Sequence, residues 1–125
     1  MLFDSDILIW VERGSAKAAR WIKEADERSI SVQTYMEILQ GAGTRQEIQI
    51  TKSFLSDFGF VVLPLTENIG HRASIYIEEY AVPHGLRVGD ALIAATAMEN
   101  NLVLATGNQK HFRPIKDLRL HLFKP

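Results

Sequence analysis

The sequence predicts an α/β fold, in which a mostly parallel sheet is covered by helices on both faces. Short apolar runs of strand length alternate with longer segments that have helical periodicity. One run, residues 60–63, is continuously apolar, and an alanine-rich segment, residues 88–100, has the small face that permits close packing on a sheet. Alternation of this kind is typical of parallel sheets with crossover helices.

The elements follow from apolar spacing and from the residues that interrupt it. Strands are predicted at residues 1–4, 29–32, 60–63, 102–105 and 119–123. Helices are predicted at residues 7–11, 16–27, 33–40, 46–58, 67–80 and 88–100. No repeat or linker divides the chain, and its 125 residues predict one domain spanning 1–125.

Composition excludes several classes of protein and site. Hydrophobic residues make up 46% of the chain, which is enough for a core, and the net charge of −1 provides no global basic field for nucleic acid. Cysteine is absent, so disulfides and thiolate metal sites are excluded and a cytoplasmic location is expected. No apolar stretch is long enough to span a membrane, and the N-terminus has no basic lead typical of a signal peptide.

Four side chains with oxygen atoms lie near predicted strand-to-helix junctions: Asp4, Glu37, Asp90 and Asn108. In a parallel sheet, ligands bind beyond the carboxyl ends of the strands. The predicted topology brings all four segments to that edge, because the helix that begins near Asp90 must run back to deliver the fourth strand. We therefore expect these side chains to lie close together.

Each of the four also has a purely structural interpretation. Thr34 and Glu37 have the spacing of a capping box, and Asp90 suits an N-cap or the first turn of a helix. Asn108 and Asp4 suit side-chain turns. These interpretations do not account for the joint placement, nor for Asp6, a second carboxylate in an otherwise apolar segment.

Clustered carboxylates repel one another, and a divalent cation relieves that repulsion. Oxygen ligands without cysteine or a histidine pair favour Mg²⁺ or Mn²⁺ over Zn²⁺. Such a site can activate water and stabilise charge on a phosphoryl centre. The four histidines show no zinc-binding spacing, and His111 is expected to be a surface residue.

Four segments in order resemble the conserved blocks of PIN-domain proteins, and most closely those of VapC-type toxins. They are LFDSDILIW, YMEILQG, VGDALIAATA with LVLAT, and TGNQKHF. The resemblance runs from Met1 to about Phe112, and its third block is the most specific.

The resemblance implies a three-layer α/β/α sandwich and a metal-dependent endoribonuclease that is the toxin of a toxin–antitoxin pair. It implies a Mg²⁺ or Mn²⁺ site on Asp4, Glu37 and Asp90, with Asn108 completing the catalytic pocket. A VapB-type antitoxin that blocks the site and a homodimer are also implied. Some relatives have an acid where this chain has the neutral Asn108, and the missing carboxylate argues against a second tightly held metal ion.

Further roles are expected around that site. Asp6, commonly Asn in the family's opening block, is a candidate helper that adds a carboxylate, and Thr106 is a candidate to order a water on the metal. Water activated there is expected to attack an RNA phosphodiester. Lys110 and Arg113 are candidate contacts to the RNA backbone, or else ordinary solvated bases.

Three other functions are consistent with parts of the sequence. Asp4 and Asp6 match the D-x-D of haloacid-dehalogenase-type phosphatases, with Asp4 as nucleophile, although Leu8 does not fit that motif. A response-regulator receiver domain shares the length and the acids but requires an aspartate after the third strand, where Leu63 and Pro64 stand. The third is a non-catalytic, PIN-like binding module.

Overall fold

A five-stranded, wholly parallel sheet in the order β3-β2-β1-β4-β5 forms the centre of the computed structural model, which describes residues 1–125. The strands are β1 Leu2–Phe3, β2 Ser29–Ser31, β3 Val61–Leu63, β4 Leu104–Thr106 and β5 Leu120–Leu122. The helices are α1 Ser5–Glu12, α2 Ala16–Glu24, α3 Val32–Gln40, α4 Arg45–Asp57, α5 Glu67–His84, α6 Val88–Glu99 and α7 Gln109–Phe112.

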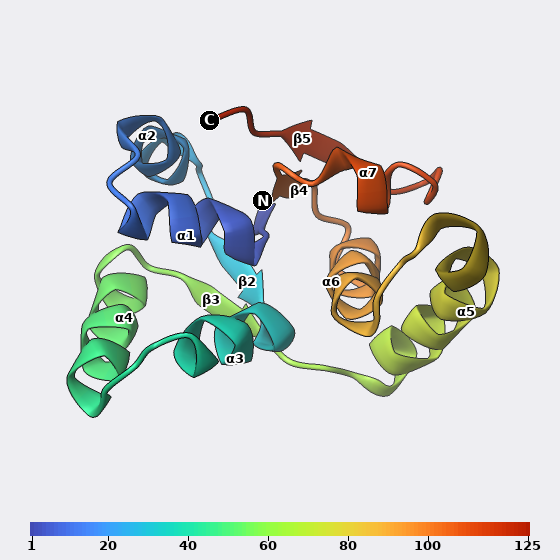
Figure 1. Ribbon diagram of the computed structural model, residues 1–125, viewed down its shortest axis with the longest axis horizontal. Helices are drawn as coiled ribbons and strands as arrows, with labels where there is room; N and C mark the ends of the chain where they lie inside the picture. The colour runs from blue at the N-terminus through green and yellow to red at the C-terminus, as the bar shows by residue number, and fades with distance from the viewer.

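The sheet separates two hydrophobic clusters, which confirms the predicted three-layer sandwich. Leu2 and Leu104 face the cluster that includes α5 and α6, whereas Phe3 and Ala105 face the cluster that includes α1, α2 and α4. This division follows from strand geometry, because successive side chains point to opposite faces. Figure 1 shows the two groups of helices on either side of the strands.

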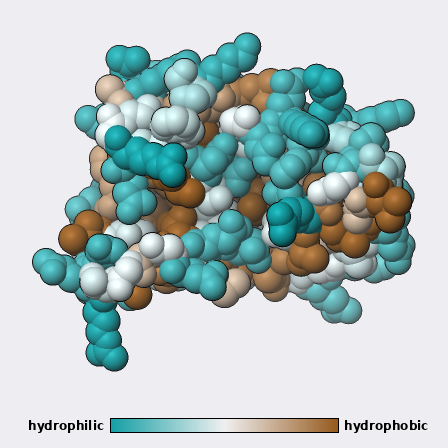
Figure 2. Space-filling view, viewed as in Figure 1, coloured by the Kyte–Doolittle hydropathy of each residue, from teal (hydrophilic) through white to brown (hydrophobic).

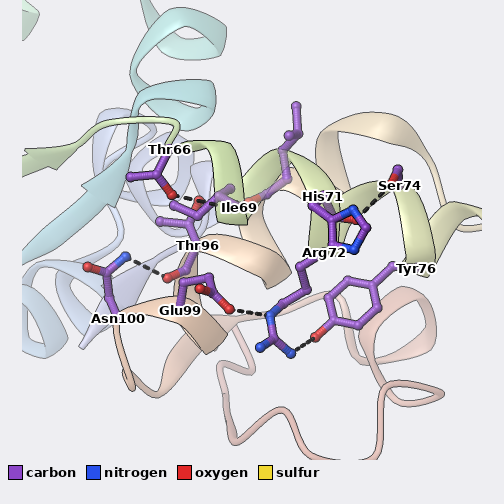
Figure 3. A network of polar contacts seen from close by, with 10 residues as sticks. Thr66, Ile69, His71, Arg72, Ser74, Tyr76, Thr96, Glu99 and Asn100 are labelled. Carbon is purple, nitrogen blue, oxygen red and sulfur yellow. Dashed lines mark hydrogen bonds and ion pairs between the residues drawn. The ribbon is translucent and has the colours of Figure 1, made fainter.

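Helix α6 packs against both the sheet and α5. Its alanines at 91, 94, 95 and 97 are all fully buried, and their small side chains allow close approach. A polar network joins α6 to α5 at its C-terminal end (Figure 3), where Arg72 Nε lies 2.6 Å from Glu99 Oε2 and the Arg72 guanidinium lies 3.5 Å from the Tyr76 hydroxyl. The helix that carries Asp90 is thereby held to the sheet by its buried alanines and to α5 by Glu99 at its C-terminal end.

Several helix ends differ from those predicted. Helix α2 ends at Glu24, because the Arg28 guanidinium binds the Lys23 carbonyl at 2.8 Å and also the carbonyls of Ile22 and Phe58. Helix α5 continues past Tyr80 to His84 with Pro83 in its last turn, and ends where Gly85 adopts a φ of 70°. The single turn α7 was not predicted, because four residues are too few to show a period.

Strand β4 begins two residues later than predicted and includes Thr106. The chain leaves α6 through Asn101, whose φ is 53°, and only then becomes extended. In the resulting register Leu2 pairs with Leu104 and Phe3 with Ala105. The next positions on the two neighbouring strands are Asp4 and Thr106, so the register places these two residues side by side.

The strand order changes direction between β1 and β4. From β1 the chain builds outward through β2 and β3 on one side, and through β4 and β5 on the other. At such a switch point the crossover helices diverge and leave a crevice at the carboxyl ends of the strands. None of the helices combines the length and the apolar character needed to cross a membrane.

Candidate metal centre and active site

Asp4 follows β1 and lies at the switch point. Its side chain is 6% exposed. One carboxylate oxygen accepts a hydrogen bond from the Thr106 hydroxyl at 2.7 Å, and the other accepts one from the Ser5 backbone N–H at 2.7 Å. The second bond makes Asp4 the N-cap of α1. Asp4 therefore has a structural role at the start of α1 and also lies where a metal ligand is expected.

Glu37 lies in the second turn of α3, and the capping-box interpretation is wrong. Ser31 is the N-cap of that helix, and its hydroxyl accepts from the Thr34 N–H at 2.9 Å. The Glu37 carboxylate instead accepts from Gln33 Nε2 at 3.1 Å, and its second oxygen lies 3.4 Å from the Ser5 hydroxyl. Because that hydroxyl is also 3.4 Å from Asp4 Oδ1, Ser5 lies between the two carboxylates.

Asp90 lies in the first turn of α6, as predicted, and Arg87 holds the N-cap position. The preceding Gly89 permits α3 to approach α6, because a Cβ there would lie 3.2 Å from Gln33 Nε2 and 3.6 Å from Glu37 Oε1. Asp90 Oδ2 is buried and makes no hydrogen bond, although His111 Nδ1 lies 3.1 Å away.

Asn108 and His111 complete the edge of the site. The Asn108 N–H donates to the Thr106 hydroxyl at 3.0 Å, and Asn108 Nδ2 lies 2.8 Å from His111 Nδ1. That ring nitrogen also lies 3.1 Å from Asp90 Oδ2. A tautomer whose Nδ1 accepts from the amide leaves Asp90 Oδ2 without a donor, whereas the tautomer with a proton on Nδ1 donates to Asp90. His111 is half-buried against the site and is not the surface residue that was expected.

Asp6 lies beside the loop that follows β4. Its Oδ2 accepts from the Gly107 N–H at 2.7 Å, and its Oδ1 is buried without a partner. Position 107 requires glycine, because a Cβ there would lie 2.9 Å from Asp6 Oδ2 and 3.2 Å from the Phe123 carbonyl. Asp6 therefore holds the loop that carries Asn108.

Burial and like charge act together on the acids. Burial, together with the charges of Asp6 and Asp90, raises the pKa of Asp4 from 3.8 to about 7, against the hydrogen bonds from Thr106 and Ser5 that lower it. Burial likewise raises the pKa of Asp6. The fold thus holds carboxylates together at an electrostatic cost that a bound cation would relieve.

The donor set suits a hard divalent ion. No group of three or more carboxylate or imidazole side chains is close enough to enclose a metal by itself. Mg²⁺, however, usually binds one or two carboxylates and keeps several waters. The desolvated Asp4 and the buried Asp90 Oδ2, which makes no hydrogen bond, fit that kind of site.

Comparison with known proteins identifies the family. The PIN-domain family model matches residues 1–117. The chain belongs to the PIN-domain family. Ribonuclease VapC10 of Mycobacterium tuberculosis is 36% identical over 123 residues, which cover 95% of this chain and 90% of that protein.

Two solved structures extend the likeness to the fold. A toxin–antitoxin complex from Klebsiella pneumoniae matches with a TM-score of 0.79 and 31% identity, over 94% of this chain and 93% of the other. VapBC-1 from nontypeable Haemophilus influenzae matches with a TM-score of 0.82 and 26% identity, over 97% and 96%. These matches favour the PIN fold over the phosphatase and receiver alternatives.

Three residues of the site were not predicted from the sequence. Ser5 is brought to Glu37 by the packing of α1 against α3. Gln33 precedes Glu37 by one turn of the same helix, which is the spacing at which helical side chains meet. His111 lies three positions after Asn108, a spacing that places two side chains on one face of a helix. That spacing is the only sequence signal available for it.

The pKa of Asp4 predicts how stability depends on pH. Because the folded value of about 7 lies above 3.8, the folded chain binds more protons than the unfolded chain between these pH values. In the absence of divalent ions, stability should therefore fall as pH rises from about 4 to about 7. Replacing Asp4 with Asn should remove this loss, which has an upper limit of about 4 kcal/mol.

Urea unfolding of the wild type and Asp4→Asn in EDTA at several pH values measures this effect. The stability advantage of Asp4→Asn should grow between pH 4 and pH 7 and then level off. A difference that stays constant across that interval would contradict the raised pKa.

Proposed function

We propose that this PIN-domain chain is a Mg²⁺- or Mn²⁺-dependent endoribonuclease and the toxin of a toxin–antitoxin pair. One observation carries the metal-dependent chemistry: the carboxylates of buried Asp4 and half-buried Asp90 converge at the switch point, and one Asp90 oxygen is buried without a hydrogen bond. The likeness to a protein named as a ribonuclease supports RNA as the substrate.

Each residue has a definable task in this proposal. Asp4 and Asp90 would hold the ion, and Glu37, oriented by Gln33, would add a ligand or bind one of the ion's waters. Thr106 orients Asp4, because its hydroxyl proton is directed to that carboxylate. The bound ion would supply Lewis acidity that activates water and offsets charge on the phosphoryl group.

Asn108 and His111 occupy the outer side of the pocket. The Asn108 amide is neutral, so it can position a substrate oxygen without adding to the repulsion among the acids. His111 is half-buried beside Asp90 and fixes the amide through the 2.8 Å contact between Nδ1 and Asn108 Nδ2. Asp6 acts by holding the Gly107 loop, and its other oxygen is buried without a hydrogen bond.

Substituting Asp4 or Asp90 with Asn should lower Mg²⁺-dependent RNA cleavage by more than about 100-fold, since residues that merely support metal ligands already cost about 10–100-fold. The exposed Asp57→Asn variant on α4 is the matched control and should retain activity. Thermal unfolding separates lost chemistry from lost structure, because Asp4→Asn should be at least as stable as the wild type at pH 7. Undiminished, metal-independent cleavage by both variants would contradict the proposal.

An antitoxin is the proposed partner, and the surface offers a place for it. The solved complexes from Klebsiella pneumoniae and Haemophilus influenzae support a partner of this kind. An apolar hollow of about 370 Å³ lies between α1, α3 and α4, and its lining includes Leu8, Val11, Ile38, Ile50 and Phe54. Figure 2 shows hydrophobic atoms reaching the surface on the side where Figure 1 places α3 and α4. A homodimer stays a prediction.

Ile50 is 61% exposed beside that hollow, so it provides a test. The chain should co-purify with the product of the gene just upstream when the two are expressed together, and Ile50→Glu should weaken this complex at least tenfold because a charge would be buried without a partner. Lys52→Glu is the control, because it introduces the same residue at an exposed position of the same helix. Equal retention of the partner by both variants would argue against this surface.

A further inference from the structure

A second hollow of about 470 Å³ lies between the C-terminal end of α5 and α7. Its lining consists of His84, Gln109, Lys110, Arg113 and Pro114, without any acidic side chain. All but the proline are exposed. Polar donors from two separate elements therefore face one cavity beside the carboxylate site.

Helix α7 directs its side chains to different places. Phe112 is fully buried in the core and anchors the turn, and His111 lies beside Asp90. Lys110 and Arg113, three positions apart, share the remaining exposed face and line the hollow. The same single turn thus connects the carboxylate site to a basic surface whose position is fixed by a buried phenylalanine.

The two cations at this hollow are not neutralised within the chain. The contacts between basic and acidic side chains within 4.0 Å are Arg72 with Glu99 and His111 with Asp90, so neither Lys110 nor Arg113 has a carboxylate within that distance. The chain as a whole carries a charge of −1, so this is a local excess of positive charge. Unpaired Lys and Arg beside polar donors are suited to a phosphate group.

We propose that this hollow binds a backbone phosphate of the RNA strand that flanks the cleaved phosphodiester. The inference rests on the proposed ribonuclease function. With a rise of about 1.5 Å per residue, Arg113 lies roughly 7 Å along the helix axis from Asn108, so a neighbouring nucleotide of a strand that enters the carboxylate site reaches it. Gln109 and His84 add hydrogen-bonding groups on either side of the two cations.

This site positions RNA without reading its sequence, since contacts to phosphate fix register and orientation. It also accounts for substrate binding by a chain of nearly neutral charge, because Lys110 and Arg113 place positive charge next to the carboxylates of the crevice. Because both cations lie outside the carboxylate cluster, their removal should affect binding of RNA rather than the chemical step.

The test is the double variant Lys110→Gln/Arg113→Gln, with Arg45→Gln/Lys52→Gln on α4 as a control that removes the same charge from exposed positions. In cleavage assays the double variant should raise KM for RNA about tenfold and leave kcat within about twofold. Binding in EDTA is measured by fluorescence anisotropy with a short fluorescein-labelled single-stranded RNA. The slope of log K against log salt concentration should be smaller in magnitude by roughly 1.4 in the double variant, or about 0.7 for each phosphate-binding cation removed. The control should match the wild type in both assays.

The outcomes separate this proposal from the one on which it rests. If the wild type binds RNA with the expected salt dependence but does not cleave it, the ribonuclease proposal fails and the phosphate site stands. If the double variant keeps the wild-type affinity and salt dependence while cleavage persists, the phosphate site is wrong. A loss of kcat at unchanged KM, or an equal loss in the control, would also overturn it.

Discussion

The hydrogen bond between Thr106 and Asp4 is the contact on which the site depends. It joins two residues 102 positions apart across the central strands β1 and β4, over 2.7 Å. It forms because both residues occupy the position that follows the same paired register, at the carboxyl ends of parallel neighbours. Once Thr106 is held there, its oxygen accepts from the Asn108 N–H, and the loop that leads to α7 takes its direction.

This arrangement buries acid against acid. Asp4, Asp6 and Asp90 approach one another because strand order and helix packing require it, and the resulting pKa of Asp4 near 7 reflects the cost. The supporting hydrogen bonds lessen that electrostatic cost but do not remove it, because Asp6 Oδ1 and Asp90 Oδ2 are buried without a hydrogen bond. Proteins commonly retain such strain at functional sites, where a ligand relieves it.

The fold was predictable from the sequence because alternating strand-like and helical segments are enough to indicate a parallel sheet. That indication holds even where the predicted ends of the segments are wrong. The convergence of Asp4, Asp90 and Asn108 was predictable for the same reason, since carboxyl ends of strands share one edge. Glu37 was correctly placed at the site, although in the second turn of its helix rather than the first. Boundaries failed where side chains set them, as when Arg28 binds the last carbonyls of α2.

Features that depend on tertiary packing were beyond the sequence. Helix α7 is a single turn held by Phe112, so no periodicity indicated it, and the place of His111 beside Asp90 was not predicted. Lys110 and Arg113 were candidate RNA contacts, but the hollow that they share with His84 was not predicted. His84 reaches the hollow between α5 and α7 because α5 continues through Pro83 to His84, whereas the predicted helix ended at residue 80.

Calorimetric titration of Mg²⁺ or Mn²⁺ at pH 7, in two buffers of different ionisation enthalpy, tests the central claim most directly. Since the pKa of Asp4 is about 7, metal binding should displace about half a proton from this carboxyl, and the measured heat should differ between the buffers accordingly. Asp4→Asn should lose both the binding and the buffer dependence. Equal heats in both buffers, unchanged by Asp4→Asn, would contradict a cation site built on the buried carboxylates.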